Sequence, residues 1–185
     1  ILLVTIFLIS SFEWHKMSKN KSYYFFGFIY LLISLFCVFK IRFDFASDAS
    51  LFLLITIICI LTDIGGFIFG KVFRGPKLIK YSPNKTYSGL LGSFLLSFTI
   101  IPINFFFNFL NDVTLTALVM FTFVVSGISQ LGDILISYFK RVSKIKDTGN
   151  IIPGHGGLLD RIDGMIFAFP IAYLLIFFNF IEIVK

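Results

Sequence analysis

Long runs of residues without charge constrain the fold of this chain more than any other feature. These runs occupy residues 23–39, 49–70, 86–111, 113–132 and 164–181, with only Asp63 interrupting the second, and a further apolar run opens the chain at 1–12. A helix needs about 20 apolar residues to cross a bilayer, with a range of about 17–25. Inside lipid each backbone amide must be satisfied within its own segment, which favours helices. The sequence therefore predicts an all-α polytopic transmembrane protein with about five to six spans.

The composition agrees with a single membrane domain over residues 1–185. The chain is 57% hydrophobic and 14% charged, whereas a soluble domain has about 25% charged residues. Cys37 and Cys59 both lie in predicted spans and suit packing better than a disulfide or a metal site. Because Ile1 stands inside an apolar run, we expect additional N-terminal membrane segments to precede it.

The basic residues are concentrated on alternate connections between the predicted spans. Most of the 16 Lys and Arg residues lie in segments 13–22, 71–87 and 139–163. Cytoplasmic loops carry an excess of Lys and Arg, so this alternation places all three segments in the cytoplasm. Basic patches also occur in nucleic-acid-binding proteins, but the spans favour anionic lipid or nucleotide phosphate as the partner, and no nucleic acid.

Segment 137–163 is densely charged and lies between two apolar runs. Charge is costly near a bilayer, so such a cluster favours a functional site, and a phosphate-bearing substrate would account for it. We expect residues 137–145 to continue the preceding helix past the membrane surface. Residues 147–157 are rich in glycine and predict a loop, and residues 158–163 are expected to begin the last helix.

Two carboxylates around this segment suggest a metal site. Asp133 ends an apolar span, and Asp160 stands near a helix start, with Asp163 one turn later. Carboxylates near a helix start often only complement the helix dipole. If the loop folds back, however, Asp133 and Asp160 meet, and two close carboxylates favour a cation between them. Carboxylate oxygens together with substrate phosphates are typical Mg²⁺ ligands.

Other polar residues have both a structural and a functional interpretation. Asp63 precedes Gly65 and Gly66, which suggests a broken helix lining a polar cavity; the alternative is an Asp paired with a Lys at the interface. His155 is flanked by glycines whose amides can approach an anion, or it is a structural hydrogen-bond donor. The GxxxG spacing of Gly66 and Gly70 permits close helix contact.

The residues of segment 137–163 resemble the signature of the phosphatidate cytidylyltransferases, also called CDP-diacylglycerol synthases. The matching positions are Ser137, Phe139, Lys140, Arg141, Lys146, Asp147, Gly149, Pro153, His155, Gly156, Gly157, Asp160, Arg161 and Asp163. Upstream, LTDIGGFIFG and SPNKTYSG resemble two further family blocks. The chain departs from the family pattern at three positions. Ile64 stands where the family has Thr, Ser88 where it has Glu, and Ile136 where it often has Glu.

The resemblance implies transfer of the cytidylyl group of CTP to phosphatidate, giving CDP-diacylglycerol and pyrophosphate. It implies a catalytic group made of Lys146, Asp147, His155, Arg161 and Asp163. The residues expected to bind substrate or shape its cavity are Asp63, Ser82, Lys85, Thr86, Lys140, Arg141, Gly156 and Gly157. Asp133 and Asp160 are expected to hold Mg²⁺, with a second cation left open.

The expected partners are CTP, phosphatidate and the lipid bilayer, with a homodimer left open. The expected location is a bacterial inner membrane that the chain crosses several times, with the active site on the cytoplasmic face. The alternatives are a CTP-dependent lipid kinase of the polyprenol or phytol type, which would release CDP, and an anion transporter. The gathering of charge at one face argues against a transporter, which would spread charge across the membrane.

Overall fold

The apolar runs fold as helices. The computed structural model describes residues 1–44, 49–79, 82, 85–107, 110, 113–151 and 156–179. Within these residues the helices are α1 (Leu2–Ser18), α2 (Tyr24–Phe43), α3 (Ser50–Phe73), α4 (Tyr87–Ser97), α5 (Ile100–Phe107), α6 (Leu115–Val142) and α7 (Leu159–Phe177). The described part of the chain has no β-strand, only an isolated bridge between Lys77 and Thr86. The all-α prediction is confirmed.

Four helical segments of the described chain are long and apolar enough to cross a membrane. They are Tyr24–Phe43, Ser50–Phe73, Tyr87–Phe107 and Leu115–Val142. The apolar run at 1–12 and the last predicted span, at 164–181, correspond to the helices α1 and α7, but neither helix is among these four. α7 carries Asp160, Arg161 and Asp163 in its first two turns, which makes its start polar.

The run at 86–111 was predicted as one span, but a turn divides it. α4 ends at Ser97, and α5 begins at Ile100 after a turn at Phe98 and Thr99. Pro102 stands in the first turn of α5. The first N–H groups of a helix have no partner within the helix, so a proline there costs no hydrogen bond. The two short helices together still have the length and hydropathy of one span.

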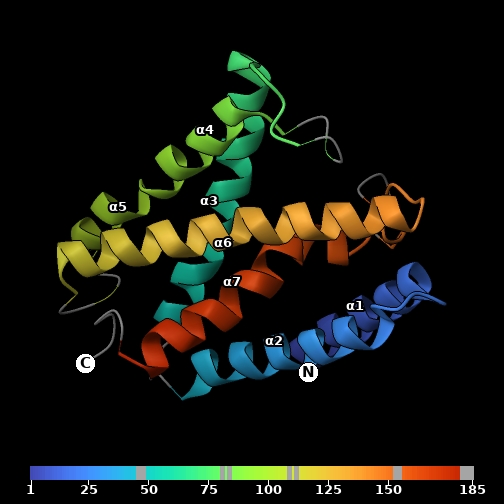
Figure 1. Cartoon of the computed structure of the whole chain (residues 1–185). Coiled ribbons are helices and arrows are strands. Elements are labelled where there is room, and N and C mark those ends of the chain that lie inside the picture. The colour runs from blue at the N-terminus through green and yellow to red at the C-terminus, as the bar shows by residue number, and fades with distance from the viewer. Residues whose placement is uncertain are drawn as a thin grey trace.

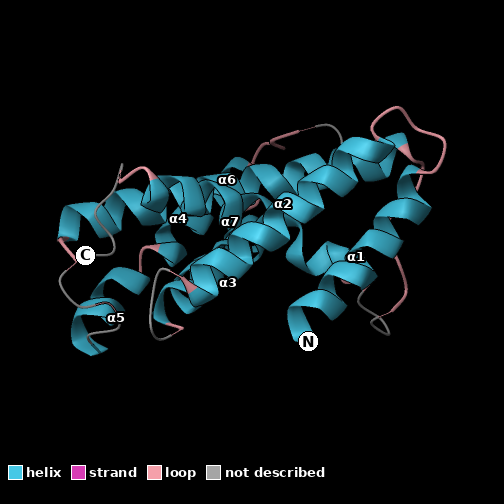
Figure 2. Cartoon of the chain, turned by 90° about the horizontal axis from the view of Figure 1, so that it is seen from below, coloured by secondary structure: helices cyan, strands magenta, loops and turns pink. Residues whose placement is uncertain are grey.

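The helices pack as neighbouring pairs. Figure 1 shows α7 running along α6, and α1 along α2, with α3 crossing behind α6 and α4 packed against α3. Figure 2 shows α1 and α5 at opposite ends of the molecule. α7 contacts α2 and α3 as well as α6, so it lies between the N-terminal and C-terminal helices. The first residues of α7 are thereby held on several sides.

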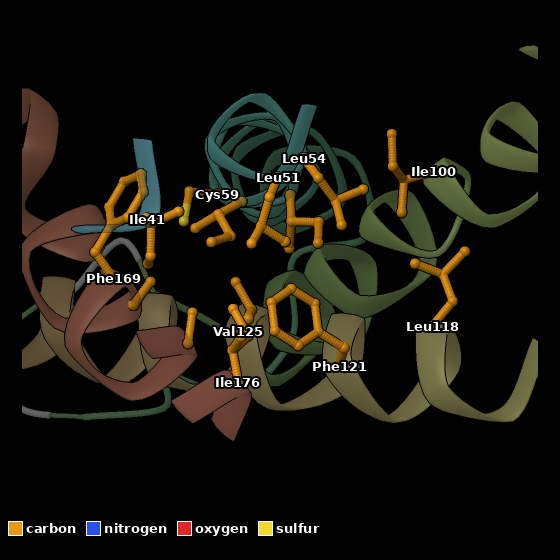
Figure 3. Close-up of a cluster of buried hydrophobic side chains, with 14 of the residues drawn as sticks. Ile41, Leu51, Leu54, Cys59, Ile100, Leu118, Phe121, Val125, Phe169 and Ile176 are labelled. Carbon is orange, nitrogen blue, oxygen red and sulfur yellow. The ribbon is translucent and has the colours of Figure 1, made fainter. Parts of the chain in front are cut away.

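The largest core cluster joins α3, α6 and α7. Leu51 and Leu54 of α3 lie opposite Phe121 of α6, and Phe169 of α7 lies at one side (Figure 3). A second cluster contains Trp14 of α1, Ile136 of α6 and residues Leu159 and Ile166 of α7. The second cluster is important for the site because it anchors α1 against the beginning of α7.

Glycines allow α3 and α4 to approach closely. A Cβ at Gly65 would lie 2.4 Å from the carbonyl oxygen of Gly92, and one at Gly92 would lie 2.2 Å from Phe69 Cβ. Ser93 Oγ also donates to the carbonyl of Thr62 at 2.8 Å. Lipid tails are as apolar as these side chains, so close van der Waals contact and hydrogen bonds hold such helices together. The contact places Asp63 of α3 beside the segment that precedes α4.

Candidate active site

A polar cavity of about 340 Å³ lies between α3, α4, α6 and α7. It brings together charged residues that are far apart in the sequence. Its charged lining residues are Asp63, Lys85, Asp133, Asp160, Arg161 and Asp163. All six belong to the predicted site, so the structure gathers most of its charged members at one place.

The close contact of α6 and α7 brings Asp133 to the beginning of α7. A Cβ at Gly132 would lie 2.6 Å from Phe167 Cδ2, and one at Gly164 would lie 2.4 Å from Ser129 Oγ. Neither position therefore has room for a side chain. Because the backbones approach this closely, Asp133 of α6 and Asp163 of α7 line the same cavity.

Lys85 neutralises part of the negative charge in the cavity. Its Nζ lies 2.6 Å from Asp133 Oδ2, and Ser137 Oγ donates to Asp133 Oδ1 at 3.3 Å. Asp63 is also within electrostatic range of Lys85. The lysine predicted to bind substrate is therefore held by the carboxylate predicted to bind metal.

Asp63, Asp133 and Asp163 form a group of interacting carboxylates. Asp63 and Asp163 each experience the negative charge of Asp133 and of one another. Asp163 is buried and accepts a hydrogen bond from the Gly164 amide at 2.8 Å. Like charges repel at close range, so this group favours a bound cation.

Asp160 is held by donors from three directions. Its Oδ1 accepts from Lys140 Nζ at 2.9 Å, and its Oδ2 accepts from the amides of Thr148 at 2.9 Å and Gly157 at 3.0 Å. Burial alone would raise the pKa of this carboxyl, but the hydrogen bonds from Lys140, Gly157 and Thr148 outweigh it and lower the pKa. Asp160 is consequently a carboxylate in this structure.

The segment before α4 contributes hydroxyl groups. Ser82 and Thr86 both line the cavity, as predicted for substrate-binding residues. Thr86 Oγ1 also accepts from the Gly89 amide at 3.1 Å, so this threonine caps α4. Ser88 stands where the family has Glu, and its hydroxyl donates to the carbonyl of Arg74. That contact fixes the turn before α4.

Other predicted residues lie outside the lining of the cavity. Arg141, Lys146 and Asp147 are exposed and do not line it. Lys140 does not line it either and forms an ion pair with Asp160. His155 falls outside the described residues. The catalytic or binding roles of these residues remain predictions.

Gly156 and Gly157, the two glycines predicted to bind substrate, have distinct structural roles. Gly156 adopts φ +83°, a conformation that favours glycine. Gly157 is buried, and its amide donates to Asp160 rather than facing the cavity. Its predicted contact with a substrate anion would therefore require that hydrogen bond to open.

Sequence reasoning missed Gln130. It lies one helical turn before Asp133 on α6 and lines the cavity. Its Nε2 is buried and has no hydrogen-bond partner among the described residues. A polar amide three residues before an intramembrane Asp was the signal available in the sequence, because such residues share a helix face.

The donor set of the cavity fits Mg²⁺, although the ligand sphere is not provided by the protein alone. No group of three or more metal-ligating side chains forms within the described residues. Mg²⁺, however, is usually bound by one or two carboxylates together with substrate phosphates and water. Asp133 and Asp160 offer oxygen donors in one cavity, and both are held by lysines, Lys85 and Lys140. The chemistry of the site is compatible with the predicted ion.

Comparison with known proteins gives one consistent result. The model of the cytidylyltransferase family matches residues 1–179. The phosphatidate cytidylyltransferase of Staphylococcus haemolyticus is 41% identical over 117 residues, covering 63% of this chain and 45% of that protein. That of Rickettsia conorii is 39% identical over 137 residues, covering 70% and 60%, and that of Rickettsia felis is 35% identical over 179 residues, covering 88% and 74%.

The chain spans about half the length of several of the curated relatives that it matches. Its long apolar helices and its relatives identify it as a membrane protein. The match of the family model extends over nearly the whole chain and includes every described residue that lines the polar cavity. The chain therefore belongs to the cytidylyltransferase family.

Proposed function

We propose that this chain transfers the cytidylyl group of CTP to phosphatidate, giving CDP-diacylglycerol and pyrophosphate. The observation that carries the proposal is the polar cavity between long apolar helices, where three interacting carboxylates meet Lys85 and Arg161. Family membership and the names of the relatives support the same reaction.

The chemistry of this reaction suits a site without an activated serine or cysteine. A phosphate oxygen of phosphatidate attacks the α-phosphorus of CTP and forms a new P–O bond. The bond from the α-phosphorus to the oxygen that bridges to the β-phosphorus breaks, and pyrophosphate carries away the electron pair. The nucleophile is already an anion, so the main barrier is repulsion between two phosphate groups, which positioning and charge neutralisation lower.

Cations of the chain are placed to reduce that repulsion. Lys85 and Arg161 line the cavity and would contact the phosphates. Lys140 would hold Asp160 in place through their ion pair. Ser82, from the same segment as Lys85, would add a hydroxyl donor. Gln130, whose amide nitrogen is buried in the same wall as Asp133, would donate a further hydrogen bond to substrate.

We propose Mg²⁺ as the cofactor, held by Asp133 and Asp160 together with substrate phosphates. When bound, the ion would neutralise phosphate charge and polarise the phosphorus–oxygen bonds. Asp63 and Asp163 would add negative charge around it. Lys85 pairs with Asp133 in this structure, and we propose that it turns toward the incoming phosphates when the ion binds.

The shape of the site suits a substrate with a polar head and apolar tails. Phe67, Leu78 and Leu90 line the cavity alongside the charged residues. Phe67 is 69% exposed on α3, a helix long and apolar enough to cross the membrane. Lipid would therefore reach the charged residues from the side of the bilayer, past Phe67.

The proposed location is a bacterial inner membrane, with the cavity open to the cytoplasm. The basic residues of segments 71–87 and 139–163 support this orientation. CTP would then enter from the cytoplasm. A homodimer remains a prediction, and a mass measurement on the protein in detergent would check it.

A position-specific label in CTP tests the reaction. The full-length protein in detergent receives phosphatidate and Mg²⁺ with CTP labelled at either the α- or the γ-phosphate. Cytidylyl transfer puts the α label into the lipid and the γ label into pyrophosphate. Lipid carrying the γ label, with CDP released, would overturn the proposal in favour of a lipid kinase. Anion uptake into vesicles without any turnover of CTP would favour a transporter.

A further inference from the structure

A buried carboxylate on α1 contacts the glycine-rich loop of the signature, more than a hundred residues away in the sequence. We call this the signature loop, and the structure describes its residues 147–151 and 156–158. Glu13 is 1% exposed, and the sequence pattern gave it no role. It lies near the C-terminal end of α1, next to Trp14 of the cluster that packs α1 against α7. A buried carboxylate is costly unless it is hydrogen-bonded or paired, so its partners explain its presence.

The partners of Glu13 all belong to the signature loop and to the start of α7. Oε1 accepts from the Leu158 amide at 3.0 Å, and Oε2 accepts from the Leu159 amide at 2.7 Å and from Thr148 Oγ1 at 3.2 Å. The N-cap residue of α7 is Leu158, whose side chain makes no capping hydrogen bond to the helix. Glu13 therefore supplies, from another helix, the acceptor that the first amides of a helix require.

Two glycines of the loop make room for this carboxylate. A Cβ at Gly149 would lie 2.5 Å from Glu13 Oε1, and one at Gly157 would lie 2.6 Å from Glu13 Oε2. Neither glycine has a positive φ, so backbone conformation does not require glycine at these positions. At Gly149 the three atoms nearest to the added Cβ all belong to Glu13. The space that Glu13 occupies is therefore the physical reason why this position has no side chain.

Glu13 and Asp160 hold the same short segment from two sides. Thr148 donates its hydroxyl to Glu13 and its amide to Asp160. Asp160 also binds the Gly157 amide and the Lys140 ammonium. A continuous set of contacts thus runs from α1 through the loop to α7 and α6. It ends at Asp160, which lines the polar cavity, whereas Glu13 itself does not line it.

We propose that Glu13 is a positioning residue that holds the signature loop and the first turn of α7 so that Asp160 and Arg161 face the polar cavity. This inference rests on the proposed cytidylyl transfer. Glu13 touches no reacting atom and acts through Thr148, Leu158 and Leu159. Its loss would leave substrate able to bind but misplace the groups that contact the phosphates, and a small misplacement can cost on the order of 100-fold in rate.

The first test compares Glu13→Gln and Glu13→Ala with wild type in the full-length protein. We expect kcat per folded molecule to fall about 10- to 100-fold in Glu13→Ala with KM for CTP nearly unchanged, and Glu13→Gln, which keeps one acceptor oxygen, to fall less. The control is Lys16→Gln, an exposed change on the same helix, which should keep wild-type kinetics. A purely structural role predicts less folded protein with unchanged kcat per folded molecule, and that result would overturn the proposal.

The second test uses the space between Glu13 and Gly149. Gly149→Ala should reduce kcat because the added methyl group would clash with the Glu13 carboxylate. In the Glu13→Ala background the same change should have little further effect, because the clashing atoms are gone. If the double variant loses kcat by the full sum of the two single effects, the proposed contact is contradicted. The comparison of the double variant with the two single variants remains informative even when each single variant is only partly folded.

A third measurement does not depend on turnover. Amide hydrogen exchange over residues 146–160 should be faster in Glu13→Gln than in wild type, with exchange in α3 unchanged. Unchanged protection of the loop would overturn the anchoring role. If wild type makes no CDP-diacylglycerol but Glu13→Gln still loosens the loop, the proposed reaction fails while the structural contact stands.

Discussion

At the scale of single residues, the two carboxylates proposed to bind metal are each paired with a lysine. Lys85 binds Asp133, and Lys140 binds Asp160. Both pairs are partly shielded from solvent, whereas the Lys40–Asp44 pair is exposed on α2. Exposed pairs contribute little to stability, but removing one partner of a shielded pair leaves an uncompensated charge. The two shielded pairs are therefore the sensitive points of the site.

Asp160→Asn should abolish most activity. The change removes the charge that binds Lys140 and turns an amide N–H₂ either toward Lys140 or toward both backbone donors, the Thr148 and Gly157 amides. We expect turnover of CTP to fall on the order of 100-fold or more and the free energy of unfolding to fall by about 1–3 kcal/mol. Labelled lipid product and thermal unfolding in detergent measure the two effects.

Asp44→Asn is the matched control for this change, because it breaks an exposed Lys–Asp pair on α2. It should leave turnover unchanged and stability within about 0.5 kcal/mol. Equal effects of Asp160→Asn and Asp44→Asn on turnover would show that Asp160 is not part of the site.

Lys85→Gln should weaken binding of CTP. Lys85 is the cation that faces Asp133 and Asp63, so its loss removes a phosphate contact and leaves the carboxylates repelling both one another and the substrate. Charge-assisted hydrogen bonds contribute about 1.5–3 kcal/mol, which corresponds to a rise in KM of about 10- to 100-fold. Steady-state kinetics measure it, with exposed Lys19→Gln as the control. An unchanged KM together with unchanged kcat would remove Lys85 from substrate binding.

At the scale of elements, the sequence predicted most of the helices, but the break expected beside Asp63 is wrong, because α3 runs unbroken from Ser50 to Phe73. Residues 147–151 and 156–157 of the predicted loop are not helical, residues 152–155 lie outside the described residues, and the helix start predicted at 158 agrees with α7, which begins at Leu159. The run at 113–132 and the continuation expected over 137–145 correspond to α6, but this helix ends earlier than expected, at Val142, before a turn in which Lys144 has φ +57°. Hydropathy and glycine content are local properties, so they are readable from the chain. The hydrogen bonds of Glu13 join residues that are remote in the sequence, so no local sequence pattern indicates them.

Gly92→Ala should separate α3 from α4. The added methyl would meet Phe69 at a distance that real contacts do not reach, and overpacking of this kind costs about 1–3 kcal/mol. The shift would also move Asp63 relative to Lys85, so activity should fall together with the midpoint of thermal unfolding.

Gly127→Ala is the control for Gly92→Ala, because a Cβ there has only ordinary contact with Phe94 at 3.7 Å. It should change neither the unfolding midpoint nor activity. A Gly92→Ala protein as stable as Gly127→Ala would show that α3 and α4 do not require the close approach.

At the scale of the whole molecule, the arrangement of helix ends agrees with the charge pattern. Figure 1 shows that α2 ends and α6 begins on one side of the molecule, whereas α6 ends and α2 begins on the other. The basic residues near the start of α2 and the end of α6 therefore lie on one side. This agreement between packing and charge supports the proposed cytoplasmic orientation.

Cysteine labelling in intact cells tests that orientation. Cys37 and Cys59 are buried, so background labelling should be low. Asp44→Cys, at the end of α2, should react with a membrane-impermeant maleimide, whereas Asn150→Cys, in the signature loop, should react only after the cells are opened. Reaction of Asn150→Cys in unopened cells would place the signature loop outside and contradict the proposal.

The sequence by itself determined that this is a helical membrane protein, because span length and hydropathy are local properties that lipid imposes directly. It also determined the signature residues, because their types and spacing are written in the chain. Only the tertiary structure decided which of them meet. The glycine contacts between α6 and α7 put Asp133 and Asp163 in one cavity, while Arg141, Lys146 and Asp147 stay outside its lining. The structure alone also placed Glu13 beneath the signature loop, because a buried carboxylate is explained by donors that the fold brings to it.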